Sequence, residues 1–109
     1  MDTQFNALIG QQITMVCFAE FNCFIHFEGH NHIRLENSAT VISDSENLEL
    51  YPNLDGKLLN RILGDYVVRI YCPKDNLQIF LNNSTIEIPL SPDFETVMFV
   101  IDGECKAIF

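Results

Sequence analysis

The sequence predicts a mainly β protein, in which two similar antiparallel meanders pack as a sandwich or half-barrel with one short α-helix. The first observation behind this prediction is a pattern that occurs twice, with residue numbers that differ by 54: Asn6, Gly10 and Ile25 match Asn60, Gly64 and Ile79. The second is that most apolar residues alternate with polar ones in short runs, as in half-buried strands. The third is that Asn, Gly, Pro and Asp separate these runs, as in turns.

The length and composition predict one domain with a substantial core. A chain of 109 residues hides roughly two-thirds of the surface that its unfolded form exposes. Nine phenylalanines, three tyrosines and a hydrophobic fraction of 48% are enough to fill such a core. We therefore expect a single domain over residues 1–109, with an internal duplication whose halves are about 4–51 and 54–109.

The first half begins with one expected helical turn at Gln4–Ile9, which ends at Gly10 because glycine suits a left-handed helix exit. Five strands are then expected, at Ile13–Ala19, Cys23–Phe27, His32–Glu36, Ala39–Ser43 and Leu48–Tyr51. The strand at Ile13–Ala19 is apolar on both faces, which is expected of a strand buried on both sides or at a barrel seam.

The second half begins with the best helix signal in the chain. An apolar stripe at helical spacing is formed by Leu58, Leu59, Ile62 and Leu63. Asn53 or Asp55 can cap its start, and Gly64 ends it. Five more strands are expected, at Tyr66–Cys72, Leu77–Leu81, Thr85–Leu90, Phe94–Ile101 and Glu104–Phe109. Asp102-Gly103 is a strong two-residue hairpin signal between the last two.

The charge is the unusual feature of the composition. Fifteen acidic residues against six basic ones leave a net charge of −9. This argues against nucleic acid or an anionic membrane as partner, because both would repel the chain, and it favours a basic partner. The sequence begins with polar and acidic residues, so we expect no signal peptide and a cytoplasmic location.

The four cysteines, Cys17, Cys23, Cys72 and Cys105, form no C-x-x-C pair. We expect free structural thiols, as is usual in a reducing compartment. A Cys17–Cys23 bridge across a hairpin is the alternative for an exported protein.

No motif for nucleophilic catalysis, phosphate binding or zinc-dependent hydrolysis is present, so we predict no enzymatic activity and no cofactor. The three histidines are the nearest approach to a metal site. His26, His30 and His32 lie within seven residues, and Zn²⁺ prefers three or four such ligands, with Glu28 as a possible extra one. The turn at Gly29 separates His26 from the other two, so we expect a polar hairpin tip and keep a metal site as the weaker alternative.

The carboxylates are grouped along the chain. Five lie between Arg34 and Lys57 and six between Lys74 and Lys106, with no basic residue inside either segment. This predicts acidic surfaces, which either keep the protein soluble or steer it to a basic partner. The expected contact residues are Asp44, Glu46, Glu49, Asp55, Asp102 and Glu104, with Phe21 and Tyr51 as possible aromatic anchors.

Two further features carry a family resemblance. The first is the G-Q-x-[IV] start at Gly10-Gln11-Gln12-Ile13, with a degenerate copy at Gly64-Asp65-Tyr66-Val67. The second is the short apolar-x-apolar strands around turns at Phe27-Glu28-Gly29 and Leu81-Asn82-Asn83. In these features the chain resembles small acidic immunity proteins of bacterial toxin systems, including contact-dependent growth inhibition. The resemblance implies a cytosolic, non-catalytic inhibitor that blocks a toxin's active site, and it transfers no interface residue.

Charge and resemblance favour the same hypothesis. Many such toxins are nucleases, whose cleft must be basic to hold phosphate, and carboxylates on a rigid β surface can occupy that cleft. We therefore expect an immunity protein against a nuclease, such as a ribonuclease, that is a monomer or weak dimer when free. A small-molecule-binding β-barrel-like domain with an apolar cavity is the alternative, and an oligomeric structural domain is a third class.

Overall fold

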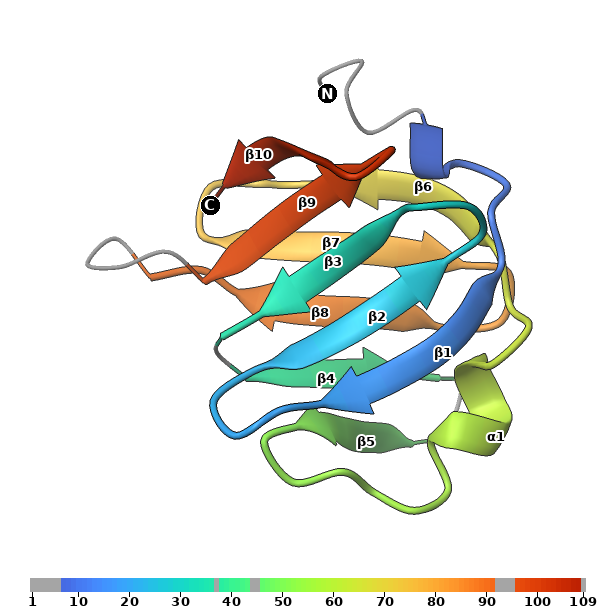
Figure 1. Ribbon diagram of the computed structural model, residues 1–109. Helices are drawn as coiled ribbons and strands as arrows, with labels where there is room; N and C mark the ends of the chain where they lie inside the picture. The colour runs from blue at the N-terminus through green and yellow to red at the C-terminus, as the bar shows by residue number, and fades with distance from the viewer. Residues whose placement is uncertain (1–6, 37, 44–45, 92–95, 109) are drawn as a thin grey trace.

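Two five-stranded antiparallel sheets lie face to face in the computed structural model (Figure 1). The structure describes residues 7–36, 38–43, 46–91 and 96–108. Within these ranges the predicted fold class is confirmed: the protein is mainly β, the two sheets form a sandwich, and there is one short α-helix.

The sheets contain strands from both halves of the chain. The first sheet has, in spatial order, β1 (Ile13–Phe18), β2 (Cys23–Phe27), β3 (His32–Leu35), β9 (Val97–Ile101) and β10 (Glu104–Ile108). The second has β5 (Asn47–Tyr51), β4 (Ala39–Ile42), β8 (Thr85–Pro89), β7 (Asn76–Leu81) and β6 (Val67–Tyr71). Each sheet therefore joins a three-stranded meander from one half to a hairpin from the other half.

The two sheets are joined at one corner by a short seam of backbone hydrogen bonds. The seam connects residues 10–13, which lead into β1, to residues 64–67, which lead into β6. Its four bonds run from Gly10 N to Val67 O (2.7 Å), Gly64 N to Ile13 O (2.9 Å), Ile13 N to Asp65 O (2.8 Å) and Val67 N to Gln11 O (3.0 Å). An antiparallel bridge between Gln12 and Tyr66 lies at its centre. The two copies of the repeated sequence pattern, at residues 10–13 and 64–67, are thus hydrogen-bonded to each other.

The core lies between the sheets and follows the alternation of the strands. Every second residue of β2 and β7 is buried, as period-2 side-chain orientation requires. The fully buried side chains include Ile25, Ile33, Ile79, Ile86 and Phe99. These residues belong to one continuous hydrophobic cluster, so side chains fill the space between the sheets.

Of the two arrangements predicted for β1, burial on both sides is wrong, whereas a seam is found at its first residue, Ile13. β1 is an edge strand rather than a strand buried on both sides, and Met15 and Phe18 are 48% and 44% exposed. Its first residue, Ile13, is buried where the strand enters the seam. The apolar composition of this strand therefore reflects one buried end and an exposed edge.

The helix is shorter than its sequence signal indicates. α1 (Leu59–Ile62) is a single turn, with Leu58 and Ile62 fully buried against the core. It ends before Gly64, whose φ of +88° provides the expected left-handed exit. In the first half only residues 7–9 of the expected turn at Gln4–Ile9 are described, and they include a short 3₁₀ segment. Among the described residues, no helix is long and apolar enough to cross a bilayer.

The four cysteines are free thiols. In the β1–β2 register Cys17 lies opposite Phe24 and Cys23 opposite Phe18, so the two thiols point to opposite faces of the sheet. Burial, with a smaller contribution from Cys17, raises the pKa of Cys23 to about 12, so this thiol is inert at neutral pH. Cys17 and Cys72 are half-buried, and Cys105 is exposed.

Replacing Gly10 or Gly64 with alanine should destabilise the protein by about 1 to 2 kcal/mol, because an L-residue is strained in the left-handed region. The two glycines have φ of +85° and +88°, and an added Cβ would meet nothing within 4 Å, so the cost is conformational rather than steric. Urea unfolding monitored by circular dichroism measures the change.

Gly56→Ala is the matched control, because Gly56 has an ordinary φ and equally open space around it. We expect this variant to unfold within about 0.5 kcal/mol of the wild type. An equal loss in all three variants would contradict a special role of the two seam glycines.

Candidate functional site

The carboxylates expected at the interface lie in two separate regions of the structure. Asp44 lies outside the described residues. Glu46, Glu49 and Asp55 lie around β5 and α1, whereas Asp102 and Glu104 lie at the β9–β10 turn. Figure 1 shows these two regions at opposite ends of the molecule. The expected contact residues therefore do not form one surface.

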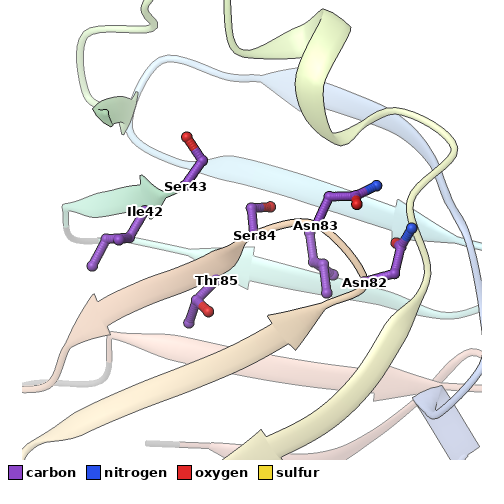
Figure 2. A pocket seen from close by; sticks show the side chains of 7 residues that line it. Ile42, Ser43, Asn82, Asn83, Ser84 and Thr85 are labelled. Atoms are coloured by element: carbon purple, nitrogen blue, oxygen red, sulfur yellow. The ribbon is translucent and has the colours of Figure 1, made fainter. Parts of the chain in front are cut away.

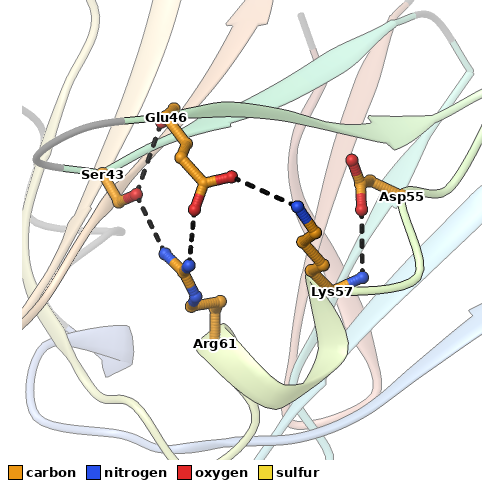
Figure 3. Close-up of polar contacts among 5 residues, drawn as sticks. All are labelled: Ser43, Glu46, Asp55, Lys57 and Arg61. Carbon is orange, nitrogen blue, oxygen red and sulfur yellow. Dashed lines mark hydrogen bonds and ion pairs between the residues drawn. The ribbon is translucent and has the colours of Figure 1, made fainter.

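Glu46 already has basic partners within the chain (Figure 3). Its carboxylate lies 2.6 Å from Nη2 of Arg61 and 3.9 Å from Nζ of Lys57. Arg61 also donates to the Ser43 hydroxyl at 3.3 Å. These contacts connect Ser43 and Glu46 to α1, so Glu46 has a structural role.

Asp55 and Glu49 shape the loop between β5 and α1. The Asp55 carboxylate accepts a hydrogen bond from Lys57 N at 3.0 Å, which forms an Asx turn just before α1 (Figure 3). The Glu49 carboxylate accepts one from Asn53 N at 3.0 Å, but its side chain remains exposed on the outer face of β5. Of these two residues, Glu49 is the more available for an external contact.

The β9–β10 turn has the predicted two-residue form. Asp102 and Gly103 have φ of +54° and +79°, which matches the left-handed pair that tight hairpins prefer. In the following strand Glu104 lies 2.9 Å from Nζ of Lys106. The hydrogen bond and charge of Lys106 hold the pKa of the exposed Glu104 carboxyl below its usual range. Lys106 therefore offsets the charge of Glu104 locally.

Two carboxylates, those of Glu49 and Glu87, lie on the outer face of the second sheet. In the strand register Thr40 of β4 lies between Glu49 of β5 and Glu87 of β8. Since neighbouring strands are about 4.8 Å apart, the two glutamates are separated by about 10 Å across the sheet. Glu87 accepts a hydrogen bond from Gln78 at 3.1 Å, which orients its carboxylate. We call this cross-strand row of Glu49, Thr40, Glu87 and Gln78 the acidic row.

An aromatic cluster lies beside the acidic row. Tyr71 is opposite Gln78 in the register, and the Arg69 guanidinium lies 4.8 Å from the Tyr71 ring centre and 5.6 Å from that of Phe80. These contacts fix the Arg69 side chain over the rings.

Sequence reasoning missed Glu87 as a site residue. Strand alternation alone places it on an outer face, but only the pairing of β8 with β4 places it near Glu49.

The three histidines lie closer together than the sequence predicts. All three line a pocket of about 290 Å³ together with Gly29, Asn31 and Gly103. His26 and His32 are direct cross-strand partners, with ring centres 5.3 Å apart. The expectation that the turn at Gly29 separates His26 from His32 is wrong, because the hairpin register places these two residues opposite each other. We call this site the histidine pocket.

The environment of His32 favours a neutral imidazole. Burial, then the nearby His26 and Arg34, lower the pKa of His32 below its usual value. Phe24 packs near both rings, with ring centres 6.2 Å from His26 and 5.8 Å from His32. Within the described ranges, no group of three or more His, Cys, Asp or Glu side chains is arranged to hold a metal ion.

The second half has a pocket in the equivalent place. It measures about 410 Å³ and is lined by Ile42, Ser43 and residues 81–85, at the β7–β8 turn (Figure 2). The histidine pocket lies at the β2–β3 turn, which is the corresponding turn of the other meander. Hydroxyl and amide groups replace the imidazoles here, so the two sites have different chemistry.

Asn31 connects the histidine pocket to the rest of the fold. It is only 6% exposed, and its amide donates to Gln11 Oε1 at 2.8 Å and to Glu28 O at 3.1 Å. Its Oδ1 accepts a hydrogen bond from Asp102 N at 2.8 Å. One buried side chain therefore ties the β2–β3 turn to both the seam and the β9–β10 turn.

We compared the chain with protein-family models, curated proteins and solved structures, and none of them matched. The acidic row and the histidine pocket are therefore interpreted from their own residues.

Asn31→Ala should lower the free energy of unfolding by about 2 kcal/mol, because it leaves Asp102 N–H and the Glu28 carbonyl without the amide partner. Asn83→Ala is the control in the equivalent turn, since Asn83 is exposed and makes one long contact of 3.5 Å to Asp65. We expect the control to change stability by less than about 0.5 kcal/mol. Urea unfolding of both variants tests this, and equal losses would show that Asn31 has no special role.

Proposed function

We propose that this protein is a non-enzymatic immunity protein. It binds a basic toxin domain in the cytoplasm, a nuclease of a contact-dependent growth inhibition system, and blocks the toxin's active-site cleft. The observation that carries this proposal is the charge: the net value is −9. Arg34, Lys57, Arg61 and Lys106 each lie within 3.9 Å of a carboxylate of the same chain, so little basic charge remains for an acidic partner.

The acidic row is the surface that best suits such a partner. Glu49 and Glu87 project from β5 and β8, which both pair with β4, so a basic cleft would meet carboxylates that are already positioned. Such preorganisation reduces the entropy that binding costs. Tyr71, Phe80 and Arg69 lie alongside, and these residue types are enriched in protein–protein interfaces.

This assignment changes the contact residues that the sequence suggests. Glu46 and Glu104 form ion pairs with basic side chains of their own chain, and Asp55 is half-buried in the turn before α1, so we assign these three residues to the scaffold. Glu49 remains a contact residue and Glu87 joins it. Asp102 is placed at the far end of the molecule and belongs to a different surface.

A small-molecule-binding domain is the second candidate. Among the described residues, buried side chains form one continuous cluster between the sheets, where this candidate requires an apolar cavity. The specific observation that favours this candidate is the pair of open pockets at the turns, of about 410 and 290 Å³. Native mass spectrometry of the purified protein would detect a retained ligand.

The test of the immunity function is binding to the basic toxin domain encoded by the neighbouring gene. We expect a complex that inhibits the nuclease and weakens as the salt concentration rises from 50 to 200 mM, because salt screens charge attraction. Glu49→Gln combined with Glu87→Gln should weaken binding by about tenfold or more, measured by isothermal titration calorimetry.

Glu104→Gln is the matched control, because Lys106 already offsets this exposed carboxylate. It should leave the dissociation constant within about twofold. A neighbouring gene that encodes no toxin, or a toxin that the wild-type protein does not bind, would reject the function. Wild-type affinity in the double variant would reject only the acidic row as the contact surface.

A further inference from the structure

The whole histidine content of the chain gathers in one place. The sequence contains three histidines, and all three line the histidine pocket. His26 lies near the end of β2 and His32 begins β3, so the hairpin register makes them direct partners across the two strands. The equivalent turn of the second half has no histidine. The fold therefore concentrates imidazole groups at one of two similar sites.

The separation of the His26 and His32 rings is close to that of two imidazoles bound to one metal ion. In a tetrahedral site each imidazole nitrogen lies about 2.0–2.1 Å from the metal, which places the two ring centres about 5 Å apart. The observed ring centres are 5.3 Å apart and the rings are tilted by 45°. A metal ion could therefore bind both rings after side-chain rotation, with the strands left in place.

We propose that His26 and His32 bind one divalent transition-metal ion at the histidine pocket. Imidazole suits Zn²⁺, Ni²⁺ and Cu²⁺, whereas Mg²⁺ prefers oxygen ligands. No set of three protein ligands is preformed among the described residues, so water completes the coordination sphere. Such a site exchanges its ion readily and leaves positions open for a ligand from outside the chain.

The surroundings of the pair support this assignment. Phe24 packs against both rings, and Met15 and Val100 are the next residues of the same cross-strand row, so apolar groups restrict the imidazole orientations. The negative net charge attracts cations to the protein. The positive charge of Arg34 lies near His32 and would repel a metal ion, but the Glu36 carboxylate, 3.5 Å from Arg34, partly offsets this charge.

Metal binding to the full chain tests the proposal, whether or not the protein binds a toxin. The purified protein is titrated with Zn²⁺ and Ni²⁺ by calorimetry, with Mg²⁺ as the ion that should not bind. We expect one ion per chain, and His26→Gln or His32→Gln should each weaken binding at least tenfold. His30→Gln is the matched control from the same pocket, and it should stay within threefold of the wild type.

Nuclear magnetic resonance of the wild-type histidine rings gives a readout that does not depend on any variant. Zn²⁺ should shift the ring signals of His26 and His32 more than those of His30. Thermal unfolding in the presence of EDTA checks that each variant is folded. Absence of binding, unchanged His26 and His32 signals, or a loss in His30→Gln equal to that in the other two variants would overturn the proposal.

Discussion

The seam of four backbone hydrogen bonds between residues 10–13 and 64–67 is the constraint on which the rest of the structure depends. It joins the first strand of each meander, and side chains from the turns extend it. Glu28 accepts a hydrogen bond from Gln12 N at 2.8 Å, and Asn82 accepts one from Tyr66 N at 3.0 Å. These two side chains stand at equivalent places in the two meanders. The seam thus fixes the turns, and the turns form the two pockets.

Most of the strand positions are predictable from the sequence, because period-2 alternation and turn residues are local signals. The sequence does not predict that each half places its hairpin in the sheet of the other half. Alternation shows which face of a strand is buried, but not which strand lies beside it. β4 follows β3 directly in the chain yet pairs with β8. The helix signal at Leu58–Leu63 has the correct spacing, but a helix of one turn gains too few hydrogen bonds to extend without further packing.

For the candidate site too, the sequence predicts the residue types but not which residues lie together in space. The sequence shows how many carboxylates the chain has, but not which of them have partners. Arg61 neutralises Glu46 across 15 residues, and Glu87 approaches Glu49 only through β4. For the histidines, the distance between His26 and His32 depends on the register of one hairpin. Their separation along the chain does not reveal that register.

Because each sheet combines a meander from one half with a hairpin from the other half, neither half can complete a sheet alone. β3 has β9 as one neighbour and β8 has β4, so neither half of the chain carries all the strands of either sheet. If the chain were cut between β5 and α1, each piece would expose the inner edge of its meander, and the other piece holds the hairpin that covers it. The two pieces would be complementary, and each would serve as the template on which the other folds.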